Sequence, residues 1–222
     1  MRLSELFREV EFDGSIKNDA DINLVTDDSR LVRPGSLFVC IRHRSFDGHT
    51  AALDALASGA AAVVTQDRLG LENELRVADS RSAYARLCAA LCNHPERKLR
   101  MIGVTGTNGK TTVTTLIRNI LSDSGTKTLL TGTVCNRLGD ENLPSGLTTP
   151  KPPELYSLLS RAVPQGCKAC VMEASSQALA QGRLEGIDFD AAVFTNITRD
   201  HLDYHGTFEN YISAKKKLFE HS

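Results

Sequence analysis

Apolar residues fall into short blocks over the first hundred positions, and each block has the period of one type of element. Leu3, Leu6, Phe7 and Val10 follow the three-to-four-residue spacing of a helix face. Later blocks are short apolar runs bounded by Gly, Pro and polar residues, which is typical of strands. The elements predicted after this first helix are, in chain order, a strand from 24, a turn at 34–35, a strand over 36–41, a helix from 47 ended by Gly59, a short strand, and a helix over 80–94 with Ser80 as its N-cap.

From residue 100 onward, strand patterns alternate with helix patterns. The predicted elements are a strand over 101–104, a helix over 111–125, a strand over 127–134, a helix over 149–166, strands over 168–176 and 189–197, and a helix over 207–221. Such alternation is typical of βαβ units, so we predict an α/β protein whose second part contains a parallel sheet. Only one helix follows the last strand, whereas parallel sheets normally have both faces covered. We therefore expect this domain to be incomplete and the chain to be the N-terminal part of a longer protein.

A polar segment with one proline, residues 94–99, separates the two patterns. Domain boundaries usually fall in such polar, proline-containing segments. We therefore predict two domains, at residues 1–98 and 99–222.

The charge balance limits the class of protein. The net charge is −1, from 26 Lys and Arg against 27 Asp and Glu, whereas general nucleic-acid binding usually requires a strongly basic surface. No apolar run approaches the roughly 20 residues of a membrane span, and the first residues lack the apolar centre of a signal peptide. We expect a cytoplasmic monomer that binds no nucleic acid and does not insert into membranes.

Six cysteines raise the question of a zinc site. Cys167 and Cys170 form one Cys-x-x-Cys pair, whereas Cys88 and Cys92 are four residues apart on a predicted helix. A structural zinc site usually takes two close pairs of ligands, and this spacing supplies only one such pair. We therefore favour reduced, mostly buried thiols over zinc ligands.

The stretch GVTGTNGKTT, residues 103–112, lies between a predicted strand and a predicted helix. A standard phosphate-binding loop has Gly, four residues and then Gly-Lys-Ser/Thr, which would place the first glycine at position 104. Position 104 is Val, so the stretch departs from the standard spacing.

The rest of this stretch nevertheless has the chemistry of a phosphate site. Gly106 and Gly109 allow the backbone to approach a phosphate closely, and the start of the helix offers free N–H groups. Lys110 would neutralise phosphate charge and the Thr111 hydroxyl would bind Mg²⁺. An ordinary turn would not explain Gly-Lys-Thr-Thr at a helix start, so we predict nucleotide binding.

Two further segments carry candidate ligands. Glu173 ends an apolar strand, where the second acidic residue of a nucleotide-binding sheet would lie and could hold Mg²⁺. Asp200, His201, Asp203 and His205 follow the last strand within six residues. Sites in α/β sheets gather at the carboxyl ends of strands, although a polar loop alone more often faces solvent. By the same reasoning the three lysines at 215–217 would form a solvated helix face.

Several separated motifs together resemble the Mur ligases of peptidoglycan synthesis. In chain order they are DDSR, RPGSLFVCI, FDGH, TGTNGKTT, TTP, MEASSQAL and FTNITRDHLDYHGTFENYISAKKKLF. The resemblance covers nearly the whole chain, and is closest to the members that add the third amino acid to UDP-MurNAc-L-Ala-D-Glu. It implies a small N-terminal UDP-binding α/β domain followed by a central P-loop-type domain. The glycine spacing that departs from the standard rule fits this family.

The resemblance also implies roles for individual residues. The UDP end of the substrate would contact Ser29, His43, Arg44 and Ser45. ATP would bind at Gly106, Thr107, Asn108, Gly109, Lys110, Thr111 and Thr112. The peptide and pyrophosphate parts of the substrate would contact Thr148, Thr149, Ser175, Gln181 and Arg183.

Metal binding and catalysis are implied for a smaller set. Thr111 and Glu173 would hold one Mg²⁺ and His201 would help to hold a second. Lys215 matches the lysine that CO₂ carbamylates in this family, and a carbamate is an oxygen ligand where an ammonium would repel the metal. Lys110, His201 and Lys215 are thus the expected catalytic residues.

The resemblance implies an ATP-dependent amide ligase. The D-Glu carboxylate would attack the γ-phosphate of ATP, and an amine of the incoming amino acid would then displace phosphate from the acyl phosphate. Family members carry a third domain that completes the acceptor and ATP sites, so this portion alone is expected to be inactive. The sequence leaves the acceptor open between diaminopimelate and L-lysine.

Three other functions each share some of these features. A folylpolyglutamate synthase would share GTNGKT, but it would not need the DDSR and FDGH segments. A truncated, non-catalytic nucleotide- or UDP-substrate-binding protein remains an alternative, although the expected catalytic residues are all present. A GTPase switch is disfavoured because no guanine-reading Asn-Lys-x-Asp follows.

Overall fold

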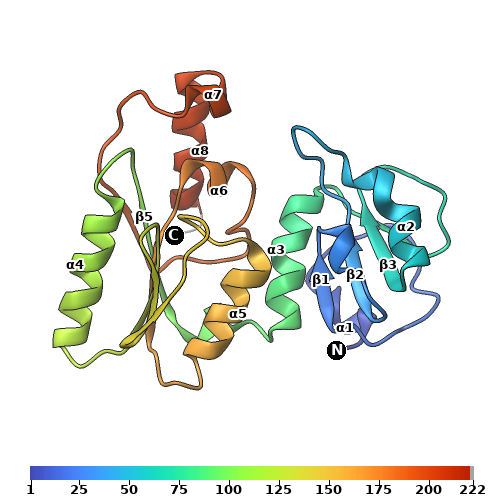
Figure 1. Ribbon diagram of the computed structural model, residues 1–222, viewed down its shortest axis with the longest axis horizontal. Coiled ribbons are helices and arrows are strands. Elements are labelled where there is room, and N and C mark those ends of the chain that lie inside the picture. The colour runs from blue at the N-terminus through green and yellow to red at the C-terminus, as the bar shows by residue number, and fades with distance from the viewer. Residues whose placement is uncertain (221–222) are drawn as a thin grey trace. The chain divides into compact units, whose positions relative to one another are not determined.

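The computed structural model describes residues 1–220, which form two compact units (Figure 1). The first unit spans Met1–Asn93 and the second begins at His94. Each unit has its own sheet and its own helices. No helix of the described part is long and apolar enough to cross a membrane.

The first unit is built on a four-stranded parallel sheet in the order β1-β2-β3-β4. Its elements are α1 (Leu3–Leu6), β1 (Leu24–Thr26), the 3-10 helix η1 (Ser29–Leu31), β2 (Ser36–Val39), the 3-10 helix η2 (Gly48–Ala51), α2 (Ala52–Ala57), β3 (Ala60–Thr65), β4 (Glu74–Arg76) and α3 (Ser80–Leu91). Phe38, Cys40 and Val63 pack against Ala52 and Ala55, whose small side chains let α2 lie close to the sheet.

Three details of this unit differ from the sequence prediction. The N-cap of α3 is Asp79, whose carboxylate accepts a backbone N–H from the first turn, and Ser80 is the first helical residue. The helix predicted over residues 1–10 has one turn only, although the four apolar residues that predicted it are all buried. Strand β4 was not predicted, because its sequence Glu-Leu-Arg contains no apolar run.

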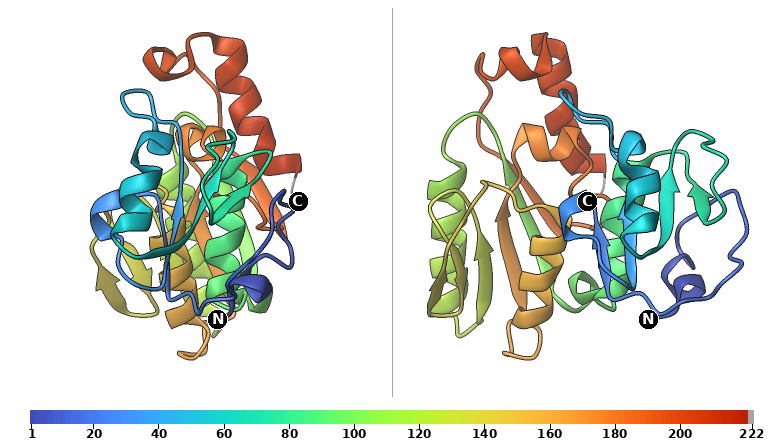
Figure 2. Two further views of the ribbon diagram at one scale, coloured as in Figure 1. Left: turned by 90° about the vertical axis from the view of Figure 1, so that its right-hand side faces the viewer. Right: turned by 45° about the vertical axis from the view of Figure 1, so that its right-hand side comes forward.

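The second unit has a six-stranded mixed sheet in the order β10-β5-β9-β6-β7-β8. Its elements are η3 (Pro95–Lys98), β5 (Arg100–Thr105), α4 (Lys110–Asp123), β6 (Thr128–Thr131), β7 (Asn136–Leu138), β8 (Glu141–Leu143), α5 (Pro152–Ala162), β9 (Ala169–Glu173), α6 (Ser176–Ala180), β10 (Ala191–Phe194), α7 (Leu202–His205) and α8 (Phe208–Glu220). Helix α4 lies on one face of the sheet, and α5 and α8 lie on the other (Figures 1 and 2).

The parallel arrangement predicted from the sequence holds for β10, β5, β9 and β6. The antiparallel hairpin of β7 and β8 was not predicted. Strand β9 is buried along its whole length, which explains its unbroken apolar sequence. The last predicted helix is α8, and His221 at its predicted end lies outside the described residues.

The four parallel strands end at one edge of this sheet, and the segments that leave them gather there. The glycine turn follows β5, residues 132–133 follow β6, Glu173 ends β9, and residues 195–201 follow β10. This edge is where α/β sheets bind their ligands.

Candidate functional site

The glycine turn between β5 and α4 depends on two glycines with positive φ. Gly106 has φ of 147° and Gly109 has φ of 83°, conformations that other residues rarely adopt. A Cβ on Gly106 would lie 1.9 Å from the Thr195 hydroxyl, so the loop after β10 also requires glycine here. Gly109 is the N-cap of α4, which directs the free N–H groups of the helix toward the turn.

Two lysines reach the carbonyl oxygen of Gly106 from different helices. The Nζ atom of Lys110, at the start of α4, donates to it at 2.8 Å, and also to the carbonyl of Thr107 at 2.9 Å. The Nζ atom of Lys215, from α8, donates to the same Gly106 oxygen at 2.7 Å. Burial lowers the pKa of Lys110, and burial together with the charge of Lys110 lowers the pKa of Lys215 to about 8.

A buried carboxylate faces the first turn of α4. Glu173 is 1% exposed, and its Oε1 atom accepts from the Thr111 hydroxyl at 2.9 Å and from the Thr133 N–H at 3.0 Å. Its Oε2 atom accepts from the Thr133 hydroxyl at 2.9 Å. These groups are the hard oxygen donors that Mg²⁺ prefers, so Thr111 and Glu173 fit the predicted metal position.

Sequence reasoning missed Thr133. It is the second residue after β6, whereas Glu173 ends β9, and its place just after a strand was the available signal. A Cβ on the neighbouring Gly132 would lie 2.3 Å from Glu173 Oε1, so the carboxylate also needs a glycine beside it.

His201 lies in the loop after β10, with a left-handed backbone at φ 52° and a half-exposed ring. Its ring contacts that of Tyr211 on α8 edge to face, with centroids 6.4 Å apart. Among the described residues, no three His, Cys, Asp or Glu side chains gather as a metal ion would require.

Tyr211 is a second residue that sequence reasoning missed. It is fully buried, its ring lies under Lys215 with Nζ 4.6 Å from the ring centroid, and its hydroxyl is 2.9 Å from the Thr107 hydroxyl. The Thr107 hydroxyl in turn accepts the N–H of Thr198 at 2.9 Å. The glycine turn, α8 and the His201 loop are thus linked through one side chain.

The loop after β10 also supports the centre of the glycine turn. The hydroxyl of Thr195 donates to the carbonyl of Asn108 at 2.6 Å, and Asn196 accepts the Asn108 N–H at 3.1 Å. These two hydrogen bonds hold the backbone of the glycine turn in place. Thr112, the last residue of the predicted ATP set, is exposed in the first turn of α4.

The predicted peptide-binding residues of this unit form one connected network. The Thr149 hydroxyl donates to the carbonyl of Glu173 at 2.7 Å and accepts the Ser175 N–H at 3.0 Å. Arg183 donates to the carbonyl of Thr149 at 2.7 Å and to Oε1 of Gln181. The hydroxyl oxygens of Thr148 and Thr133 lie 3.0 Å apart, which connects the network to the Glu173 site.

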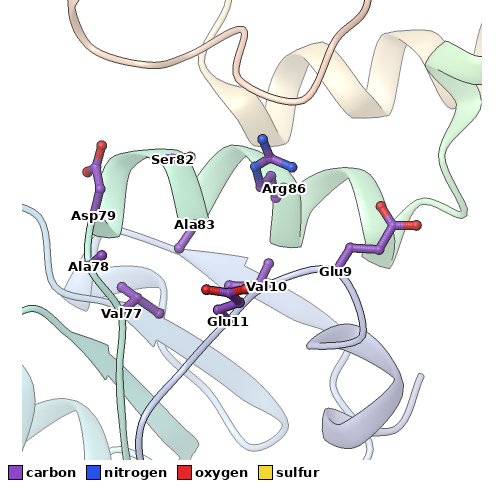
Figure 3. A pocket seen from close by; sticks show the side chains of 9 residues that line it. All are labelled: Glu9, Val10, Glu11, Val77, Ala78, Asp79, Ser82, Ala83 and Arg86. Carbon is purple, nitrogen blue, oxygen red and sulfur yellow. The ribbon is translucent and has the colours of Figure 1, made fainter.

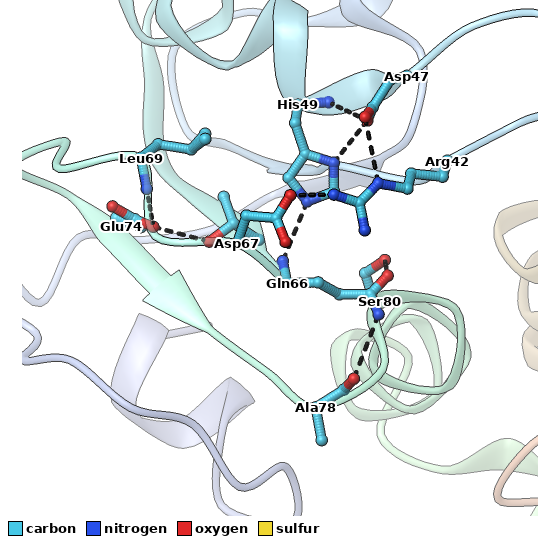
Figure 4. A network of polar contacts seen from close by, with 10 residues as sticks. Arg42, Asp47, His49, Gln66, Asp67, Leu69, Glu74, Ala78 and Ser80 are labelled. Atoms are coloured by element: carbon cyan, nitrogen blue, oxygen red, sulfur yellow. Dashed lines mark hydrogen bonds and ion pairs between the residues drawn. The ribbon is translucent and has the colours of Figure 1, made fainter.

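In the first unit, the predicted UDP-contacting residues lie on two segments that follow strands. Ser29 begins η1 after β1, and His43, Arg44 and Ser45 lie exposed in the loop between β2 and η2. Asp27, two residues before Ser29, has Oδ2 3.5 Å from His43 Nε2 and so connects the two segments. Figure 4 shows the polar network around the base of this loop.

A separate hollow of about 350 Å³ lies in the first unit, between residues 9–11 and the N-terminal half of α3 (Figure 3). Its lining includes Glu9, Glu11, Asp79 and Arg86, and none of the predicted site residues. All six cysteines are free thiols, and Cys40, Cys88, Cys167 and Cys170 are buried.

Two models of known protein families match this chain. Residues 104–222 match the model of the Mur ligase middle domain, and residues 21–92 match that of the Mur ligase family, catalytic domain. The chain belongs to the Mur ligase family.

Individual relatives agree with this assignment. The UDP-N-acetylmuramoyl-L-alanyl-D-glutamate–2,6-diaminopimelate ligase of Parabacteroides distasonis is 44% identical over 91% of the chain and 43% of its own length. A solved structure with the same enzyme name has a TM-score of 0.83 at 34% identity, covering 100% of the chain and 45% of its own. MurF ligase from Thermotoga maritima, solved in complex with ADP, has a TM-score of 0.57 at 25% identity, covering 89% and 43%. The chain spans less than half the length of these relatives.

Proposed function

We propose that this chain is the UDP-substrate-binding and ATP-binding part of an amide ligase that adds a diamino acid to UDP-MurNAc-L-Ala-D-Glu. The observation that carries the proposal is the convergence of Lys110, Thr111, Glu173 and Lys215, from three separate elements, on one sheet edge. Diaminopimelate is the acceptor named for the relatives, and it is the acceptor we propose here.

The two units would divide the substrate between them. The first unit, proposed as a domain of residues 1–98, would hold the UDP end through Ser29 and the His43–Ser45 loop. The second, proposed as 99–222, would hold ATP at residues 106–112. Its network of Thr148, Thr149, Ser175, Gln181 and Arg183 would hold the peptide and pyrophosphate parts.

The chain's own groups account for the first chemical step. The D-Glu carboxylate of the substrate attacks the γ-phosphate of ATP and forms an acyl phosphate. Lys110 offsets the negative charge that spreads over the transferred phosphoryl group, and the backbone N–H groups of the glycine turn hold the remaining phosphates. Mg²⁺, held by Thr111 and Glu173, and with a second ion near His201 and a carbamylated Lys215, would supply further charge neutralisation.

The second step needs positioning more than new chemistry. The amine of the incoming amino acid attacks the acyl carbon, an amide bond forms, and phosphate leaves with the electron pair of the broken bond. A closed site that excludes water would favour the amine over hydrolysis. Because ATP and the UDP precursor are made inside the cell, we propose that the reaction takes place in the cytoplasm, with the protein acting as a monomer.

The proposal is tested by measuring phosphate release by the complete protein that contains this chain. Release should require ATP, UDP-MurNAc-L-Ala-D-Glu and diaminopimelate together, and L-lysine should replace diaminopimelate poorly. Activity with a folate substrate in place of the UDP precursor would contradict the proposal. Ser29→Ala should raise the KM for the UDP substrate without changing that for ATP, and the reverse pattern would misplace the role of the first unit.

A further inference from the structure

The loop His43–Phe46 has a closed base and an exposed tip. At its base the N–H of Gly48 donates to the carbonyl of Ile41 at 3.0 Å, and the N–H of His43 donates to that of Phe46 at 2.8 Å. A Cβ on Gly48 would lie 2.7 Å from the backbone nitrogen of Ile41, so the closure requires this glycine. The side chains of residues 43–46 are exposed, and the ring of His43 lies with Nε2 3.5 Å from Oδ2 of Asp27.

A buried histidine, His49, lies beside Asp47 and Arg42, the two residues that flank this loop (Figure 4). The ring of His49 is 5% exposed, and its Nε2 atom accepts the backbone N–H of Gln66 at 3.0 Å. An amide N–H can only donate, so Nε2 carries no proton. The neutral ring therefore has its proton on Nδ1, which donates to Oδ1 of Asp47 at 2.6 Å.

The Asp47 carboxylate accepts several hydrogen bonds at the base of the loop. It also accepts the N–H of His49 at 3.0 Å and Nε of Arg42 at 3.2 Å. Burial would raise the pKa of Asp47, but the donors from His49 and Arg42 outweigh it and lower this pKa to about 2. The carboxylate is thus charged throughout the physiological pH range.

Gln66 connects the histidine to the rest of the unit. Its side-chain Nε2 donates to the carbonyl of Ala78 at 3.2 Å, and its Oε1 accepts from the Ser80 hydroxyl at 2.9 Å. The His49 ring therefore joins the loop to the end of β3 and, through Gln66, to the start of α3. Strand β3 and helix α3 are regular elements of the unit, whereas residues 43–46 lie in a loop between β2 and η2.

We propose that His49 is a positioning residue that holds the loop His43–Phe46 in the conformation that contacts the uridine of the UDP substrate. The inference rests on the proposed function, because that function places uridine at this loop. A loop already held in its bound conformation loses less entropy on binding, which raises affinity without a direct contact.

The test is isothermal titration of the 222-residue chain with UDP. His49→Ala removes both hydrogen bonds of the ring and should weaken UDP binding about tenfold, the usual effect of losing such a buried polar link. His49→Gln offers an acceptor to the Gln66 N–H and should recover part of the loss. Glu74→Gln is the matched control, because Glu74 organises a neighbouring loop through the N–H groups of residues 69–71 and does not contact His43–Phe46.

The control separates positioning from general destabilisation. Glu74→Gln should leave the affinity for UDP unchanged, and a loss equal to that of His49→Ala would overturn the inference. A double variant gives a second criterion: once Arg44 and Ser45 are both alanine, adding His49→Ala should cost little further affinity. Fully additive losses would mean that His49 does not act through the loop.

The remaining outcomes distinguish this inference from the function on which it rests. A folded wild-type chain that binds no UDP would overturn both. Wild-type binding with an unchanged affinity in His49→Ala would overturn the positioning role alone. If His49→Ala does not fold, Asp47→Asn, which keeps the side-chain shape but removes the charge, should weaken UDP binding in the same direction, and an unchanged affinity would again overturn the role.

Discussion

Lys110 and Lys215 share one acceptor: their Nζ atoms lie 2.8 and 2.7 Å from the carbonyl oxygen of Gly106. Two ammonium groups at one carbonyl repel each other, and Lys215 is buried whereas Lys110 is partly buried. Burial first, and then the charge of Lys110, lower the pKa of Lys215 to about 8. A carbamate forms only from an unprotonated amine, so this contact favours modification at Lys215 over the exposed Lys216 beside it.

The lowered pKa of Lys215 predicts a rise in stability with pH. The pKa is about 8 in the folded chain against 10.5 for an ordinary lysine, so the unfolded chain binds more protons between these values. The free energy of unfolding should therefore increase from pH 8 toward 10.5, by roughly 2–3 kcal/mol in total. Urea unfolding in CO₂-free buffer across this pH range measures the increase in the free energy of unfolding.

Two variants isolate this lysine from other groups that titrate in the same range. Lys215→Met should lose the increase, whereas Lys216→Met should keep it, because Lys216 is exposed. If the free energy of unfolding of the Lys215 variant had the same pH dependence as that of the wild type, folding would not lower the pKa of Lys215.

Chemical rescue tests the carbamate. Lys215→Ala should abolish ligase activity in the complete protein, because the oxygen ligand is lost, and added acetate or formate should restore part of it by occupying the same space. Lys216→Ala should retain activity and show no response to these acids. Full activity of Lys215→Ala without any acid would remove the proposed role.

Parallel strand order explains why the candidate site was visible in the sequence. The glycine turn and Glu173 each follow an apolar run, and in a parallel sheet the ends of such runs meet at one edge. Thr111, just after the glycine turn, and Glu173 are 62 positions apart in the sequence, yet the Thr111 hydroxyl lies 2.9 Å from the Glu173 carboxylate. The sequence pattern therefore predicted their meeting without any knowledge of the register.

Thr133 and Tyr211 were missed for different physical reasons. Thr133 lies after β6, but nothing local shows that β6 pairs with β9 and so brings the threonine to Glu173. Tyr211 fits the apolar face of α8, and its hydroxyl contact to Thr107 spans 104 positions. The short elements β4, β7 and β8 were also missed, because three-residue strands carry too few residues to show a period.

Lys110→Ala tests the nucleotide site. The substitution removes the only charge that the glycine turn itself would place against phosphate, so ATP-dependent activity should fall by about a hundredfold or more. Phosphate release by the complete protein measures it. Lys168→Ala, which changes a lysine at the opposite, amino end of β9, is the control, and equal losses in the two variants would point to a folding defect instead.

Gly132→Ala tests whether Glu173 holds the metal. The added Cβ would lie 2.3 Å from Glu173 Oε1 and 3.0 Å from its Cδ, so the buried carboxylate must move away from the Thr111 hydroxyl. We expect a stability loss of about 1–3 kcal/mol, and a higher Mg²⁺ concentration for half-maximal activity. Gly146→Ala is a matched control, because a Cβ there meets nothing within 4 Å. An unchanged Mg²⁺ dependence in Gly132→Ala, with the KM for ATP also unchanged, would place the metal elsewhere than at Glu173.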